Sequence, residues 1–86
     1  MVFLARSRKS MLEALALAKL GGHHVWAGAD CLDAEEHRRL TGEGVSLTRF
    51  SYSLAAASVE AVSDAVDTIR EHHPSETLWI EEAGNA

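Results

Sequence analysis

The basic segment Arg6, Ser7, Arg8, Lys9 and Ser10 combines the residue types and spacing best suited to binding an anion. It follows a short apolar run that opens the chain. Cations, hydroxyls and the free amides of a helix start bind phosphate or carboxylate through charge-assisted hydrogen bonds. The segment matches neither GxGxxG nor GxxxxGK[ST], the glycine-rich patterns that wrap phosphates. We interpret it as a candidate anion-binding loop; the alternative is a helix cap at Ser10 with cations that are solvated or paired.

Three further side chains follow apolar runs and would converge with Arg6 at the carboxyl ends of parallel strands: Asp30, Cys31 and Tyr52. A helix N-terminus can lower the pKa of a thiol, but neighbouring carboxylates such as Asp33 disfavour the thiolate. The chain has no Cys-x-x-Cys pair and no histidine placed as a base. We therefore assign no catalytic residue, and the sequence favours a non-enzymatic role without deciding it.

Four of the five histidines occur as two adjacent pairs, His23 with His24 and His72 with His73. Each pair precedes a predicted strand, at the edge of the sheet opposite the expected ligand crevice. If those strands lie two or three positions apart, a span of about 10–14 Å separates the pairs, too far for one metal ion. We expect no metal site and no cofactor.

Charge is unevenly distributed, because residues 1–43 carry no net charge and residues 44–86 carry a net charge of −5. On a helix predicted from Val59 to about His73, four acidic residues share one face, opposite a stripe of Val59, Val62, Val66 and Ile69. The four are Glu60, Asp64, Asp67 and Glu71. Like charges at this spacing cost about 0.2–0.5 kcal/mol per pair. The face therefore indicates a basic protein partner, or else a solvated surface that keeps the protein soluble.

The helix predicted over residues 11–20 is apolar nearly all round. One face holds Met11, Ala14, Leu15 and Ala18, and a second holds Ala16, Leu17 and Leu20. A crossover helix needs only one apolar stripe against its sheet. The second face is expected to meet the helix at 34–41, a protein partner or a second copy, which would make the chain a homodimer.

These residues are positioned by an expected α/β fold. Short apolar or β-branched runs predict strands at 2–5, 24–29, 45–52 and 77–81. Capping boxes at Ser10–Glu13 and Asp33–Glu36 start helices over 11–20 and 34–41, and Pro74 ends the third helix. We predict a four-stranded, mainly parallel βαβαβαβ sheet in the order 3-2-1-4, with 2-1-3-4 as the alternative. A ferredoxin-like βαββαβ arrangement competes with it.

Length and composition limit the partners and the compartment. The 86 residues make one domain, 1–86, and a net charge of −5 argues against direct binding of nucleic acid. The longest apolar stretch is too short to span a membrane, the N-terminus does not resemble a signal peptide, and one cysteine indicates the reducing cytoplasm.

We therefore expect a small protein-interaction or regulatory module that uses the acidic helix face or the apolar helix. Binding of an anion or nucleotide-like small ligand at the basic segment, with or without catalysis, is the alternative function.

Overall fold

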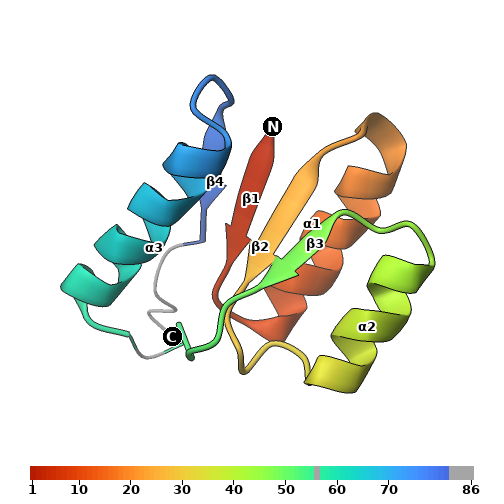
Figure 1. Cartoon of the computed structure of the whole chain (residues 1–86), viewed down its shortest axis with the longest axis horizontal. Coiled ribbons are helices and arrows are strands. Elements are labelled where there is room, and N and C mark those ends of the chain that lie inside the picture. Colours follow the sequence, from red (N-terminus) through yellow and green to blue (C-terminus); the bar gives the residue numbers. More distant parts are fainter. Residues whose placement is uncertain (56, 82–86) are drawn as a thin grey trace.

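The computed structural model describes residues 1–55 and 57–81 of the chain. Strands and helices alternate along it, as Figure 1 shows in the colours of the sequence. In chain order the elements are β1 (Val2–Ala5), α1 (Arg8–Gly21), β2 (His24–Ala27), α2 (Ala34–Gly42), β3 (Leu47–Arg49), α3 (Val59–His72) and β4 (Leu78–Ile80). This confirms the predicted order βαβαβαβ.

The strands form one parallel sheet in the order β3-β2-β1-β4. β1 lies inside it, with Phe3 paired to Val25 of β2 on one side and to Trp79 of β4 on the other. The predicted order 3-2-1-4 is confirmed: the two most polar predicted strands are the edges. The ferredoxin-like alternative is excluded, because it needs β2 and β3 to run antiparallel and they run parallel.

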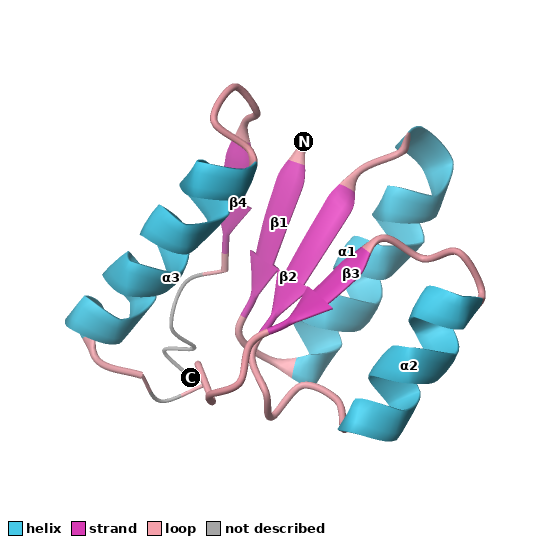
Figure 2. Cartoon of the chain, in the orientation of Figure 1, coloured by secondary structure: helices cyan, strands magenta, loops and turns pink. Residues whose placement is uncertain are grey.

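Helices cover both faces of the sheet (Figure 2). α1 and α2 lie on one side and α3 lies on the other. Alternate residues of β1 therefore enter different cores: Ala5 packs with α1, whereas Val2 and Leu4 pack with α3. Within the described ranges, every helix is too short or too polar to cross a bilayer.

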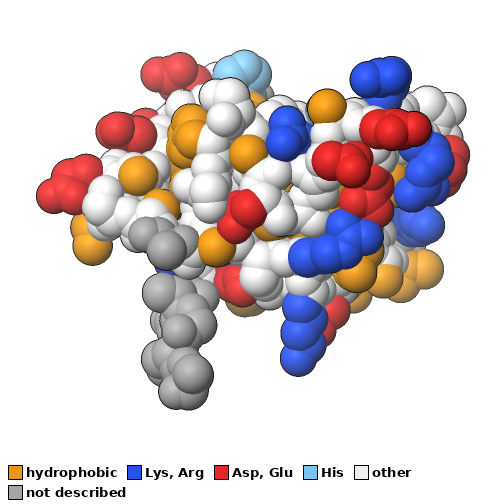
Figure 3. All heavy atoms as spheres, turned by 90° about the horizontal axis from the view of Figure 1, so that it is seen from below, with side chains coloured by type: hydrophobic (Ala, Val, Ile, Leu, Met, Phe, Trp, Pro, Cys, Tyr) orange, Lys and Arg blue, Asp and Glu red, His pale blue; other side chains and the backbone are white. Residues whose placement is uncertain are grey.

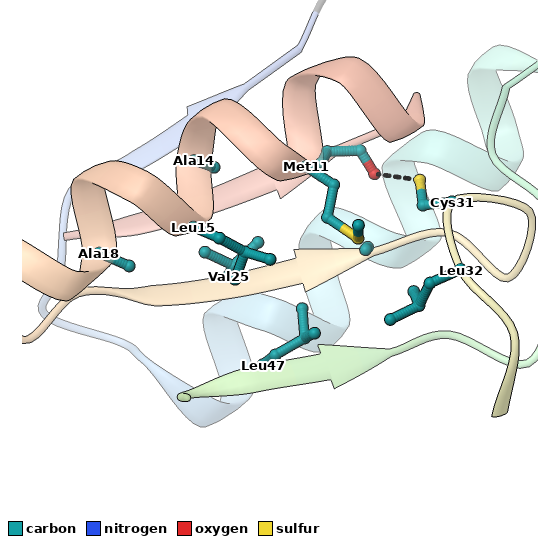
Figure 4. Packing of buried hydrophobic residues seen from close by; sticks show 10 residues of the cluster. Met11, Ala14, Leu15, Ala18, Val25, Cys31, Leu32 and Leu47 are labelled. Atoms are coloured by element: carbon teal, nitrogen blue, oxygen red, sulfur yellow. Dashed lines mark hydrogen bonds between the residues drawn. The ribbon is translucent and has the colours of Figure 1, made fainter. Parts of the chain in front are cut away.

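The core on the α1 side is continuous from the helix to β3. Figure 4 shows Met11 and Leu15 of α1 packed over Val25, with Leu47 on the next strand. The core on the α3 side contains Ala65 and Ile69 of the helix. Burying one such aliphatic side chain contributes about 1.5–3 kcal/mol, so the two cores hold the helices on the sheet.

Helix α1 begins one turn earlier than predicted, at Arg8. The predicted cap at Ser10 is wrong: Ser7 has the extended backbone of a cap residue, and its Oγ accepts a hydrogen bond from the Ser10 amide. At the other end Gly22 has a φ of 68°, a conformation that glycine adopts at little cost. The predicted cap of α2 at Asp33 is confirmed.

The strands are shorter than predicted, except β1. β2 ends at Ala27 because the next residue, Gly28, opens a turn in which its carbonyl accepts from the Cys31 amide. A side chain at Gly28 would come within 3.0 Å of the Leu54 amide nitrogen, so glycine allows the loop after β3 to close over β2. β3 and β4 each retain three ladder residues.

The buried stripe of α3 differs from the predicted one at its start. Val59 is 83% exposed, and the fully buried positions are Ala65 and Ile69. Val62 and Val66 are half-buried at the border. At about 100° per residue, Val59 lies well away from Ala65 and Ile69 around the helix, so its side chain does not face the core.

Candidate functional site

The loop after β1 is closed by a carboxylate from the far end of the chain. Glu81 accepts hydrogen bonds from the Arg6 amide at 2.6 Å, the Ser7 amide at 2.9 Å and the Ser7 hydroxyl at 2.9 Å. β4 is parallel to β1, so the residue that follows β4 arrives beside the residue that follows β1. The protein thus places its own anion where helix amides offer an anion-binding site.

These contacts hold Glu81 in its ionised form. Burial alone would raise the pKa of this carboxyl, but the hydrogen bonds from Arg6, Ser7 and Ser10 outweigh burial, and the pKa lies below its usual value. Sequence reasoning missed Glu81. Its only sequence signal is an acidic residue directly after the last strand.

The cations of the loop do not converge on a common point. Arg6 is 9% exposed and donates from Nε to the Leu54 carbonyl at 2.9 Å. Arg8 makes a two-pronged ion pair with Glu36 of α2, at 2.7 and 2.8 Å, and also donates to the Cys31 carbonyl. This pair lowers the pKa of Glu36 through its hydrogen bond and its charge. Two of the three cations are therefore engaged by partners within the chain, Arg6 in a buried contact and Arg8 at the surface.

Of the other two predicted anion ligands, Lys9 is exposed and Ser10 is half-buried. Figure 3 shows the molecule from the end where the carboxyl termini of the strands lie, and there basic and acidic side chains are neighbours on the side of α1 and α2, whereas the side of α3 shows mainly acidic side chains. Of the five predicted residues, Arg6 and Ser7 therefore precede α1 and Arg8, Lys9 and Ser10 form its first turn, and Arg6 and Arg8 bind partners within the chain.

Cys31 lies in the core, where its thiol is 3.7 Å from the Ala5 carbonyl oxygen (Figure 4). Burial, followed by the charge of Asp30, raises the pKa of this thiol, which opposes a nucleophilic role. Asp30 faces the Leu54 amide at 3.4 Å, and Tyr52 is exposed with its ring against Phe50. Asp30 and Cys31 therefore both contact backbone groups of the chain itself.

Two histidines from the separate pairs do meet, contrary to the spacing argument. The ring centroids of His24 and His73 are 5.0 Å apart, because the side chains at the C-terminal end of α3 reach β2, where His72 also lies against Trp26. Both nitrogens of His24 face hydroxyls, those of Ser46 and Thr48, and His73 faces Glu76. Among the described residues no group of three or more His, Cys, Asp or Glu side chains is arranged to hold a metal ion.

The acidic face of α3 is exposed as predicted from its helical spacing. All four side chains, Glu60, Asp64, Asp67 and Glu71, are solvent-accessible. None of them forms an ion pair with another residue in the described part of the chain. The acidic face lies on the side of the sheet opposite α1.

An apolar groove lies between α1 and β4. A groove of about 490 Å³ is lined by Met1, Phe3, Leu17, Leu20, Gly21, His23 and Trp79. Trp79 is 56% exposed and Leu20 is 86% exposed. We call the apolar set Met1, Phe3, Leu17, Leu20 and Trp79 the α1–β4 surface.

The α1–β4 surface continues along the strand. A second hollow of about 220 Å³ follows Trp79 towards the carboxyl end of β4 and is bordered by Ala14 and Ile80. Leu17 and Leu20 were expected to meet a neighbour, whereas Trp79 was missed because a tryptophan in a short strand normally indicates a buried position.

The gap in the helical cover explains the groove. α1 contacts β1 and β2, and α2 contacts β3, so β4 receives little cover on this face.

The chain matches no protein-family model, and no curated protein or solved structure is significantly similar to it. The arrangement of its own residues is therefore the basis for its function.

Proposed function

We propose that this chain is a protein-interaction module that binds through the α1–β4 surface. The observation that carries the proposal is the exposed Trp79 beside Leu17 and Leu20 on a groove of about 490 Å³. Exposed apolar patches rimmed by polar residues mark interaction sites in soluble proteins. Tryptophan is also among the residues that contribute most to binding at interfaces.

The alternative function at the loop after β1 has less support. An external anion there would have to displace Glu81, which already accepts three hydrogen bonds from Arg6 and Ser7. It would also compete with Glu36 for Arg8. We therefore place binding of a small anion second and assign no catalytic step.

The acidic face of α3 is the other part of the proposed module. Unpaired negative charges attract a basic partner over about a Debye length, close to 8 Å at physiological salt. Such attraction speeds encounter more than it tightens a complex. We therefore assign tight binding to the α1–β4 surface, and to the acidic face of α3 a separate, weaker contact with a basic protein. A buried, unpaired Cys31 suits work in a reducing compartment such as the cytoplasm.

A photo-crosslinking experiment tests the proposal with a matched control on one helix. Leu17 lines the groove and is 52% exposed, whereas Leu12 lies outside it and is 48% exposed. A photoreactive phenylalanine analogue replaces one or the other in cells that make the protein. We expect covalent protein adducts from position 17 and few from position 12. Equal yields from both positions, or none from position 17, would refute the proposal.

A further inference from the structure

β4 offers an open strand edge beside the α1–β4 surface. It is the last strand of the sheet, and within residues 1–55 and 57–81 no strand pairs with its outer side. Its residues are Leu78, Trp79 and Ile80. Edge strands are usually protected by lysine, proline or a bulge, and these three residues include no charge and no proline.

The hydrogen bonds to β1 reveal which backbone groups of β4 are free. The Val2 amide donates to the Thr77 carbonyl at 2.9 Å, and the Glu81 amide donates to the Leu4 carbonyl at 3.0 Å. In a parallel ladder, alternate residues of a strand turn both backbone groups to the same neighbour. The backbone amide and carbonyl of Trp79 therefore point to β1, and the amides and carbonyls of Leu78 and Ile80 point outward, away from the sheet.

We infer that a second copy of this chain pairs with β4 in antiparallel fashion, which joins two sheets into one. This inference rests on the proposed function and names its partner. A twofold axis beside Trp79 makes the two Trp79 residues a non-hydrogen-bonded pair, with side chains adjacent on the α1 side. Leu78 of each copy then exchanges two backbone hydrogen bonds with Ile80 of the other.

The proposed pairing is compatible with the charge of the chain. The groove lining carries no Asp, Glu, Lys or Arg side chain, so two chains of net charge −5 meet there without facing like charges. Thr77 of one copy lies opposite Glu81 of the other, whose carboxylate turns to the α1 loop. A standard interface buries about 800 Å² on each partner, which three strand residues cannot supply. Leu17 and Leu20, which are exposed on the groove beside the strand, add apolar area to the proposed contact.

Sedimentation equilibrium of the purified chain tests the pairing. Between about 10 µM and about 1 mM protein we expect the mass to approach twice 9.3 kDa. Trp79→Lys places two cations side by side at the axis and should raise the dissociation constant at least about tenfold. Leu12→Lys, the control on the far flank of α1, should leave it unchanged. Circular dichroism verifies that each variant is folded.

Amide hydrogen exchange distinguishes this dimer from another dimer without depending on any variant. We expect the Leu78 and Ile80 amides to exchange slowly in the dimer and rapidly on dilution to the monomer. A dimer in which these two amides stay rapid, or a chain that stays monomeric at 1 mM, would overturn the inference.

The crosslinking experiment distinguishes a failure of the proposed function from a failure of the pairing between two copies. Position 17 joined to a different protein, with a monomeric chain in solution, would preserve the proposed function and reject the second copy. Position 17 without any adduct would reject both.

Discussion

Two residues of the same chain segment, Glu81 and Trp79, lie in contrasting surroundings. The carboxylate of Glu81 is engaged by the amides and hydroxyl of Arg6 and Ser7, whereas more than half of the Trp79 side chain is exposed. A charged group at the end of a parallel strand meets the free amides of the neighbouring helix start. An apolar group in the middle of an edge strand needs a helix above it, and α1 contacts mainly β1 and β2.

The largest expected effect is on stability, at the buried side chain of Leu54 beside Arg6. Leu54 is fully buried, and its carbonyl accepts from Arg6. Leu54→Ala should lower the free energy of unfolding by about 3 kcal/mol, because the loop over β2 cannot collapse into the cavity. Urea unfolding measures the change, with Leu20→Ala on the open surface as the control at about 0.5 kcal/mol or less. Similar losses in both variants would show that the open surface is part of the core.

The next effect concerns the carboxylate itself. Glu81→Ala leaves the Arg6 and Ser7 amides without an acceptor and should cost about 2 kcal/mol of unfolding free energy. Glu71→Ala on the exposed face of α3 serves as the control and should change it by about 0.5 kcal/mol or less.

The Glu81→Ala variant also tests whether Glu81 prevents an external anion from binding to the loop after β1. In an amide-resolved NMR titration with phosphate, residues 6–11 of the wild type should show no saturable shifts, and the same residues of Glu81→Ala should show them. Saturable shifts in the wild type would revive the anion-binding function, because they would mean that an external ligand displaces Glu81.

A smaller effect follows from the lowered pKa of Glu81. The unfolded chain, with the usual value of 4.5, takes up the proton before the folded chain does. The stabilisation is complete above that value and is lost as the pH falls through the lower folded pKa. Urea unfolding between about pH 6 and about pH 3 should show a steeper loss for the wild type than for Glu81→Gln. Parallel curves would mean that Glu81 does not contribute to the acid sensitivity.

The smallest effect is expected on the open surface. Leu17→Lys should change the unfolding free energy of the monomer by about 0.5 kcal/mol or less, since the side chain is half exposed already. Leu12→Lys should change it by a similarly small amount when urea unfolding is measured at low protein concentration. A loss above about 2 kcal/mol for Leu17→Lys alone would indicate that this side chain supports the fold rather than a partner.

Local signals predicted most of the fold. The apolar run at 2–5, the cap at Asp33 and the proline at position 74 each act within a few residues, so they could be interpreted without knowing the tertiary structure. The start of α1 was missed because two serines three residues apart both resemble a cap. The cap at Ser7 has support from Glu81, which also accepts from the Ser7 hydroxyl and lies 74 residues away in sequence.

The candidate site was harder to predict than the fold. Leu17 and Leu20 were noticed because α1 carries more apolar residues than one face of a sheet requires. Trp79 was not, since its exposure depends on which strands α1 crosses. The proximity of His24 and His73 was likewise missed, because it depends on where the C-terminal end of α3 lies relative to β2.

The sequence by itself determined the positions of the strands and helices along the chain and the exposed acidic face of α3, but it left a ferredoxin-like arrangement open beside the parallel sheet. Each depends on periodicity and capping, which are short-range properties of a chain. Only the tertiary structure decided that Glu81 fills the loop after β1 and that Trp79 stays open at the edge. Both depend on the pairing of β1 with β4, which brings together residues more than 70 positions apart, and on three helices having to cover two faces of a four-stranded sheet.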